Sequence, residues 1–376
     1  MNKQKKRILV LSARTGGGHR AAAMAIIDEL ENHNHQLDIV HHDFMENAPR
    51  LVRNIPKMYA NITKLKSAYG TIFKLTEGSK RAQFALEAIG RPYKKEFRAI
   101  LDHFAPDVIV SCHFGINPIL STLQSYERTI PFITVVTDLV TGHPMWFDKR
   151  ADLIIVPSQE SYLRARGFGV PSSRLKIIGQ PVAAEFNQFT ADKLTIKKSL
   201  GWPTDVPTLL IMAGGDGMGK LNSLTKKIDT MKADIHIAVI TGRNHNLYKS
   251  LNARKFNHPA HIYKFRDDIA TMMHGSDILL TKAGPGTIVE GIVSRLPVVL
   301  YDFLPGQEEG NLLYVVENQA GIWASTNSLA VAAVNDILEG VVQIGGPKYE
   351  SIRKRHASAA HDIAAIVKTI ALDKVK

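Results

Sequence analysis

The stretch LLTKAGPGTIVEG, residues 279–291, decides the fold because it joins an apolar run to a helical pattern through a glycine-rich turn. An apolar strand that passes directly into a helix is half of a β-α-β unit, from which parallel sheets are built. Gly284 and Gly286 let a ligand approach the backbone, and the amides of a helix's first turn bind anions. Thr287 can cap the helix or donate its hydroxyl to a phosphate. The stretch predicts an α/β protein with either a phosphate site or an ordinary capped connection at this turn.

Short runs rich in Val, Ile and Leu alternate with helical patterns along the chain, as expected for strands that helices cover on both faces. They lie at residues 7–12, 37–43, 107–112, 132–138, 152–158, 175–181, 207–215, 235–242, 261–265, 277–284 and 297–303. A polar segment at 190–207 interrupts the series. We therefore expect two doubly wound, Rossmann-like domains, residues 1–185 and 186–349, that face each other across a cleft. A C-terminal helix at about 350–376 should pack back on the first domain.

Composition narrows the class of protein. The 376 residues are 45% hydrophobic and 22% charged, which is typical of a globular protein with a large core. The single cysteine, Cys112, excludes an internal disulfide and a cysteine-rich zinc site, and it indicates a reducing compartment. No window reaches the roughly 18 apolar residues of a spanning helix, and the run at 8–11 is too short for a signal peptide. We expect a cytoplasmic protein, peripheral on the inner face of the cell membrane.

A basic amphipathic region at about residues 50–98 carries most of the excess charge. It holds twelve Lys or Arg against three Glu, a net charge of +9, while the whole chain has a formal charge of +12. Apolar residues recur from Ile55 to Leu75 at spacings of three and four. This pattern is typical of a helix on an anionic membrane surface, with a solvated face or a nucleic-acid site as alternatives. Because no nucleic-acid-binding module is recognisable, we expect a membrane partner and no nucleic acid.

Two further glycine-containing loops follow strands of the second domain. IMAGGDGMGK, residues 211–220, contains Gly214 and Gly215, and VITGRNHN, residues 239–246, contains Arg243. The carboxyl ends of parallel strands meet at one edge of a sheet, so these loops should gather beside the glycines already described. None of them has the Walker A pattern. Together they predict a site for a nucleotide diphosphate.

The loop YDFLPGQEEGN, residues 301–311, follows the next strand. Gln307, Glu308 and Asn311 offer hydrogen-bond donors and acceptors that suit the hydroxyls of a sugar. A polar surface loop before an acidic helix start is the alternative. Because the phosphate loops should lie beside it, hydroxyl binding is the favoured interpretation.

The stretch TGGGHRAAA, residues 15–23, follows the first strand. It satisfies G-x-G-x-x-A, with Asp38 or Asp43 as the ribose-binding acid, so a nicotinamide or flavin dinucleotide is one alternative. The second domain, however, already has a nucleotide site. We therefore expect Gly18 to bring the backbone close to the substrates and His19, held neutral by the helix N-terminus, to act as a base. A capping histidine with no further role is the other alternative.

The stretch TDLVTGHPMWF, residues 137–147, ends another strand of the first domain. Asp138 and His143 supply polar groups, and Trp146 and Phe147 supply an apolar wall. This combination suits an acceptor with an apolar part. Histidines could bind a metal, but no metal-binding spacing and no D-x-D motif supports one. We expect neither a metal nor a cofactor.

Taken together, these motifs resemble those of the diacylglycerol glycosyltransferases, the monogalactosyldiacylglycerol synthases and processive glucosyltransferases of glycosyltransferase family 28. The motifs, in family order, are TGGGHRAAA, TDLVTGHPMWF, GGDGMG, TGRN, KAGPGTIVEG and PGQEEGN, which span about 80% of the chain. The resemblance implies a GT-B fold and an inverting, metal-independent transfer of a hexose. The donor would be UDP-glucose or UDP-galactose, and the acceptor diacylglycerol or a glycosyl-diacylglycerol. A more distant likeness, to the peptidoglycan N-acetylglucosaminyltransferase, leaves a lipid-linked peptidoglycan precursor as an alternative acceptor.

The resemblance also implies roles for particular residues. They are His19 as general base, Gly284–Thr287 for the diphosphate, Glu290 for the ribose, Gln307 and Glu308 for the donor sugar, and the backbone near Phe265 and Arg266 for the uracil. The basic region falls where the family has its membrane-facing segment.

Three other functions stay open on the sequence: a UDP-sugar epimerase, a dinucleotide-dependent oxidoreductase, and a non-catalytic protein that binds lipid or nucleic acid. The chain has no N-terminal extension, so we expect an enzyme of bacterial type and not a plastid-targeted one. The motifs do not separate glucose from galactose, which differ in the orientation of one hydroxyl.

Overall fold

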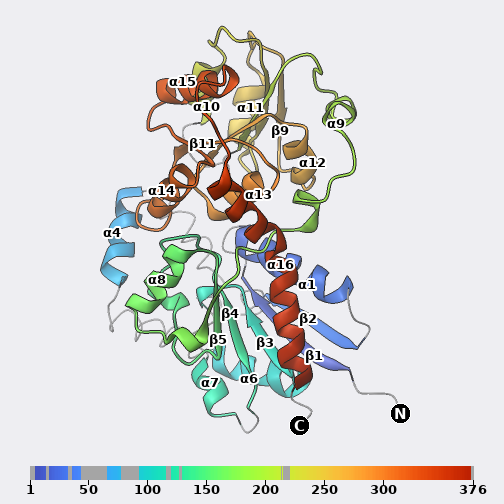
Figure 1. The fold of residues 1–376 in the computed structure, drawn as a ribbon, viewed down its shortest axis with the longest axis vertical. Helices are drawn as coiled ribbons and strands as arrows, with labels where there is room; N and C mark the ends of the chain where they lie inside the picture. The colour runs from blue at the N-terminus through green and yellow to red at the C-terminus, as the bar shows by residue number, and fades with distance from the viewer. Residues whose placement is uncertain are drawn as a thin grey trace. The chain divides into compact units, whose positions relative to one another are not determined.

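The computed structural model describes residues 5–13, 17–32, 36–43, 66–77, 93–115, 120–126, 129–212, 214 and 221–373 (Figure 1). The chain divides into two compact units. The first unit comprises Met1–Ala183, Pro305–Gln307 and Ser358–Lys376, and the second comprises Ala184–Leu304 and Glu308–Ala357.

The described part of the first unit contains a parallel sheet of six strands in the order β2-β1-β3-β4-β5-β6. These are β1 (Lys6–Ser12), β2 (Leu37–Asp43), β3 (Val108–Ser111), β4 (Phe132–Val135), β5 (Leu153–Val156) and β6 (Leu175–Ile177). The helices are α1 (Gly18–Asn32), α4 (Lys66–Thr76), α6 (Tyr93–Phe104), α7 (Leu120–Gln124) and α8 (Gln159–Gly167), with 3₁₀ turns η2 (Pro144–Trp146) and η3 (Ser172–Arg174). The strand order reverses between β1 and β3, the position at which doubly wound sheets bind ligands.

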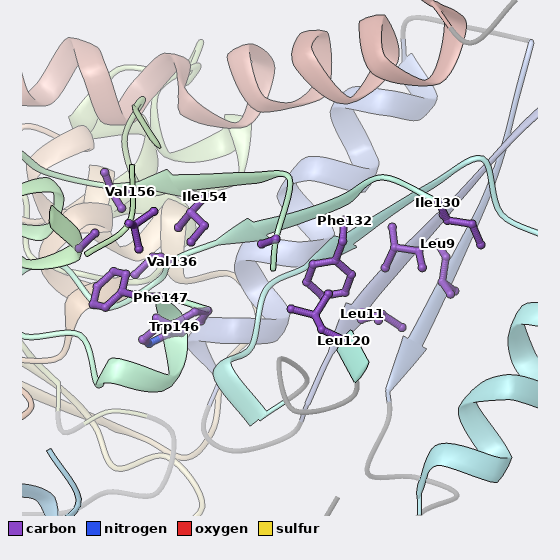
Figure 2. Close-up of a cluster of buried hydrophobic side chains, with 14 of the residues drawn as sticks. Leu9, Leu11, Leu120, Ile130, Phe132, Val136, Trp146, Phe147, Ile154 and Val156 are labelled. Atoms are coloured by element: carbon purple, nitrogen blue, oxygen red, sulfur yellow. The ribbon is translucent and has the colours of Figure 1, made fainter. Parts of the chain in front are cut away.

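Each face of this sheet carries its own hydrophobic cluster. On one face, α6, α7 and α8 bury Phe97, Leu101, Leu120 and Ala165 against the strands; Figure 2 shows this cluster. On the other face, α1 packs beside the C-terminal part of α16 (Pro347–Asp373). From Ser358 onward α16 belongs to the first unit, and its Ile363 and Val367 are fully buried there. Helices on both faces explain why β3, β4 and β5 are buried at every position, whereas the edge strand β2 carries polar residues.

The described part of the second unit has a parallel sheet in the order β12-β11-β10-β7-β8-β9. Its strands are β7 (Thr208–Met212), β8 (His236–Ile240), β9 (Ala260–Tyr263), β10 (Ile278–Lys282), β11 (Val298–Asp302) and β12 (Gly321–Trp323). Its helices are α9 (Lys193–Ser199), α10 (Leu221–Ile228), α11 (His245–Asn252), α12 (Ile269–His274), α13 (Pro285–Val293), α14 (Glu309–Glu317) and α15 (Asn327–Leu338), with the 3₁₀ turn η4 (Ala184–Phe186). The order reverses between β7 and β10, so the loops after these two strands lie at the ligand position.

Helix α13 lies close against β10. A Cβ atom at Gly291 would fall 2.6 Å from the Cδ2 atom of Leu279, so a larger residue here would force Leu279 or the helix to shift. On the opposite face, α10 and α15 pack against the strands through Leu224, Ile228 and Val334. The close packing of α13 positions its first turn, and the glycine-rich stretch from Gly284, at the end of β10.

The predicted pair of doubly wound, Rossmann-like units is confirmed. Every predicted apolar run coincides or overlaps with a strand, whereas β12 was not predicted. No helix within the described ranges is both long and apolar enough to cross a membrane. Of the basic region at about 50–98, residues 50–65 and 78–92 lie outside the described residues.

Candidate active site

His19 is the second residue of α1, directly after the turn that follows β1. Its Nδ1 atom lies 2.7 Å from the hydroxyl oxygen of Thr137, which follows β4. The side chain is half-buried, and burial lowers the pKa of His19 to about 4, while a hydrogen bond with the Cys112 backbone acts in the opposite direction. The imidazole is therefore neutral at pH 7, the state in which it can accept a proton.

Rings surround His19 at the end of the first sheet. The centroid of the His113 ring lies 4.6 Å from that of His19, and those of Trp146 and Phe114 lie 5.8 and 6.3 Å away. His113 is buried, and burial holds its pKa well below the usual value. These described rings make the surroundings of His19 poorly hydrated, which strengthens any electrostatic interaction made there.

The predicted acceptor residues lie near His19 but are not equally accessible. The Asp138 carboxylate accepts hydrogen bonds from Trp146 Nε1 at 2.6 Å and from Gln307 Nε2 at 3.0 Å. Trp146 and Phe147 are 0% and 4% exposed and belong to the core cluster of Figure 2. His143 is half-buried, its Nε2 atom lies 3.1 Å from Thr76 Oγ1, and burial lowers its pKa to about 4.

Gln307 is held on several sides within the first unit. Its carboxamide oxygen accepts a 2.5 Å hydrogen bond from the Tyr69 hydroxyl, and its backbone oxygen accepts one of 2.6 Å from Thr141. Because the Asp138 carboxylate only accepts, the amide nitrogen of Gln307 must face it. The orientation of this carboxamide is therefore fixed by Tyr69 and Asp138.

In the second unit, Gly214 after β7 and Gly284 after β10 lie beside Lys282, the last residue of β10. A Cβ atom at Gly214 would lie 3.2 Å from Lys282 Cε, and one at Gly284 would lie 3.4 Å from its Nζ. Lys282 Nζ donates to Glu308 Oε1 at 2.7 Å, and Glu308 Oε2 accepts from the Leu304 amide at 2.9 Å. Gly215 lies outside the described residues.

The first turn of α13 presents Gly286 and Thr287, both half-buried. Gly284 is the N-cap of this helix, so of the two alternatives for Thr287 the capping role was wrong. A glycine cap has no side chain to satisfy the first amides of the helix, which therefore stay suited to an anion. The helix therefore begins at Pro285, and Thr287 lies inside its first turn.

Other predicted donor residues lie on the same sheet edge or its helices. The guanidinium of Arg243 stands over the Phe265 ring, with its carbon 4.7 Å from the centroid, and Arg266 pairs with Asp268. Phe265 is 46% exposed, so its ring is accessible to a ligand. Burial and the nearby Glu185 raise the pKa of Glu290 on α13 to about 7. Asn311 donates to the Ala283 oxygen at 2.8 Å, next to the glycine-rich turn.

Gly18 is the first residue of α1 and is exposed, with space around its Cα.

Sequence reasoning did not assign Tyr69 or Lys282 to the site. Lys282 carried a signal, since it is a lone charge at the end of an apolar strand, but Tyr69 is one of many residues in a helical pattern. No group of three or more His, Cys, Asp or Glu suited to a metal occurs among the described residues.

Both halves of the chain match known protein families. Residues 19–182 match the profile of monogalactosyldiacylglycerol (MGDG) synthase, and residues 208–369 match the glycosyltransferase family 28 C-terminal domain. Monogalactosyldiacylglycerol synthase 2, chloroplastic, of Arabidopsis thaliana is 33% identical over 334 residues, which cover 85% of this chain and 70% of that protein. The chain belongs to the MGDG synthase family. It is a glycosyltransferase, and the resemblance drawn from its motifs is confirmed.

Solved structures agree with the fold of this MGDG synthase family member. MurG of Acinetobacter baumannii superposes with a TM-score of 0.59 at 10% identity, over 97% of this chain and 99% of that one. The glycotransferase of kitacinnamycin superposes with a TM-score of 0.66 at 13% identity, over 98% and 99%. The GT-B fold predicted from the resemblance is confirmed.

Proposed function

We propose that the protein transfers a hexose from UDP-galactose or UDP-glucose to diacylglycerol or a glycosyl-diacylglycerol, with inversion and without a metal. The observation that carries the proposal is the neutral His19, held by Thr137 at the reversal point of the first sheet in a chain of the MGDG synthase family. A neutral imidazole can take the proton of a hydroxyl, and the named relative makes a galactosyl-diacylglycerol.

The proposed reaction exchanges one bond for another at the anomeric carbon. As the acceptor hydroxyl attacks this carbon, His19 takes its proton. The bond from the anomeric carbon to the β-phosphate oxygen breaks, and its electron pair leaves with UDP. Attack from the face opposite UDP inverts the anomeric configuration. Amides at the start of α13 receive the developing negative charge.

The donor is proposed to bind mainly through the loops of the second sheet. The glycines of these loops admit the diphosphate, Glu290 holds the ribose, and the exposed Phe265 with Arg266 meets the uracil. The residues proposed for the donor are Gly18, Gly214, Gly215, Arg243, Phe265, Arg266, Gly284, Gly286, Thr287, Glu290, Gln307, Glu308 and Asn311. Their support is the clustering of Gly214, Gly284 and Glu308 around Lys282.

The acceptor is proposed to bind beside His19, with His143 and Asp138 as polar contacts. Since Trp146 and Phe147 are buried, we propose that they support this region from beneath.

The membrane surface is proposed to meet the basic region at about 50–98. In its described part, α4 exposes Ile72 and Leu75, which are 46% and 72% exposed, beside Lys74. Apolar side chains next to lysine suit the interface of an anionic bilayer. The protein would then work at the membrane surface.

The test mixes the protein with UDP-galactose or UDP-glucose and with vesicles of diacylglycerol and an anionic phospholipid, with and without EDTA. We expect a β-linked hexosyl-diacylglycerol in both cases. Release of an epimerised sugar nucleotide without glycolipid would indicate the epimerase instead. Transfer only to a lipid-linked peptidoglycan precursor would replace the acceptor, and loss of transfer in EDTA would refute metal independence.

A further inference from the structure

Lys282 lies at the carboxyl end of β10, with its side chain beside both Gly214 and Gly284. Its strand, β10, pairs with β7, and the order of the sheet reverses between these two strands. Its Cε and Nζ atoms run past the backbone of Gly214 and Gly284, at 3.2 and 3.4 Å from where Cβ atoms would lie. A Cβ atom at Gly214 would crowd this side chain, and one at Gly284 would touch it.

The backbone around Lys282 is irregular in a way that aims the side chain. The β10–β11 register runs from Thr281 opposite Leu300 to Lys282 opposite Asp302, so β11 has one extra residue at this point. Such bulges re-aim a side chain at the end of a strand and are common beside active sites. Gly214 has a φ of 71°, a conformation that favours glycine, so the opposite turn is also specialised.

Glu308 holds the ammonium group in place. One oxygen of its carboxylate, Oε1, accepts the 2.7 Å hydrogen bond from Lys282, and the other, Oε2, accepts a hydrogen bond from the Leu304 amide. The side chains of Lys282 and Glu308 are 17% and 4% exposed, so Glu308 is buried while Lys282 keeps some access to solvent. An ammonium group has three N–H donors, so it can hold Glu308 and a phosphate oxygen at the same time.

We propose that Lys282 binds the diphosphate of the donor and stabilises it as the leaving group. This inference rests on the proposed function and assigns to a lysine the charge that a divalent cation supplies in other enzymes. Together with the amides of Gly286 and Thr287, Lys282 neutralises the charge that grows on the β-phosphate oxygen as its bond to the sugar breaks. A fixed cation aimed at developing charge lowers the barrier without reorganising during the reaction.

The test compares UDP with uridine, which lacks the diphosphate, by calorimetric titration of the full chain. Lys282→Met should weaken UDP binding by about 10- to 100-fold, the range of a lost charge-assisted hydrogen bond, and leave uridine binding unchanged. Lys282→Arg should restore most of the UDP affinity. Lys193→Met, which removes an exposed partner of Asp277 in the same unit, should bind both ligands like the wild type.

A second variant separates charge from folding. Lys282→Met leaves the buried Glu308 carboxylate without its cation. The double variant Lys282→Met/Glu308→Gln removes both charges, so its thermal unfolding midpoint should stay closer to that of the wild type. The proposal is supported if the double variant also loses affinity for UDP but not for uridine. It is overturned if the double variant binds UDP normally, or if its affinities for UDP and uridine fall equally.

The same titrations separate this inference from the proposed function. A wild-type protein that binds no UDP would refute both. A wild-type protein that binds UDP and makes glycolipid, with Lys282 variants that match Lys193→Met, would refute only the role of Lys282.

Discussion

The Nδ1 atom of His19 lies 2.7 Å from the hydroxyl oxygen of Thr137, and this contact joins the turn after β1 to the segment after β4. A histidine base is more often oriented by a carboxylate, which raises the basicity of the ring. A threonine hydroxyl orients the ring without adding a charge. His19 therefore combines a fixed orientation with a low pKa of about 4, set by burial.

Replacement of the base is the first test of this arrangement. His19→Ala should reduce glycolipid formation by at least about 100-fold, because general-base catalysis contributes ~10²–10⁴-fold. The UDP dissociation constant should stay unchanged. Turnover of the variant close to that of the wild type would exclude His19 as the base.

Removal of the orienting hydroxyl should have a smaller effect. Thr137→Val should reduce kcat by about 3- to 10-fold, as expected for one neutral hydrogen bond, with little change in KM for the donor. Thr122→Val is a matched control, because its buried hydroxyl has no hydrogen-bond partner among the described residues. If both variants lose the same activity, Thr137 acts through packing and not through His19.

The loops that carry the candidate site follow from the sequence because of a simple property of parallel sheets. Strands buried on both faces are uniformly apolar, so each run and the loop after it can be recognised. The strand β12 was missed because Gly321–Trp323 is too short to form a run. The helix α9 falls within the polar segment read as a link, although Asp192 caps it by accepting from the Thr195 amide at 2.9 Å.

Contacts between distant residues and the degree of burial could not be predicted from the sequence. Lys282 and Glu308 are separated by 26 positions and meet only after β10, β11 and the following turn are folded. Tyr69 and Gln307 are 238 positions apart. The pKa of Glu290 depends on how tightly α13 packs, which composition does not reveal.

The raised pKa of Glu290, about 7, predicts a pH dependence of donor binding. Below pH 7 the carboxyl group is protonated, and above it the carboxylate accepts stronger hydrogen bonds from the ribose. UDP-glucose should therefore bind about tenfold more tightly at pH 8 than at pH 6. The diphosphate of UDP-glucose is esterified at both ends and does not titrate in this range.

Glu290→Gln should remove the pH dependence of donor binding, whereas Glu309→Gln, at an exposed position, should retain it. A dependence that survives in Glu290→Gln would belong to another group.

The fixed carboxamide of Gln307 predicts an effect of α4 on the donor sugar. Tyr69→Phe removes the hydroxyl that holds Gln307 Oε1, so kcat/KM for the UDP-hexose should fall by about 3- to 10-fold. UDP itself, which lacks the sugar, should bind as before. Tyr126→Phe removes a comparable but exposed hydrogen bond to Asp102 and serves as the control. Equal effects on UDP and UDP-hexose would mean that Tyr69 supports the fold and not the sugar.

Acid should destabilise the second unit through His356. This residue is fully buried, its Nε2 atom lies 2.9 Å from the Tyr314 hydroxyl, and burial lowers its pKa to about 3. In the unfolded chain a histidine takes up a proton below about pH 6.5, whereas in the folded chain His356 does so only near pH 3. Between these values the unfolded state binds more protons, so the free energy of unfolding falls as the pH falls, by up to about 1.4 kcal/mol per pH unit for each such histidine. The stabilisation is therefore complete above pH 6.5 and is lost progressively toward pH 3. His236, with a pKa lowered to about 3, contributes in the same direction.

His356→Gln keeps a hydrogen-bonding group but does not titrate, so its unfolding midpoint should change less between pH 7 and pH 4 than that of the wild type. His361→Gln, at a more exposed site on the same helix α16, is the control, and its midpoint should follow the wild-type curve. Denaturant titrations monitored by circular dichroism at each pH measure both. Parallel curves for the wild type and His356→Gln would show that other groups govern the acid sensitivity of this unit.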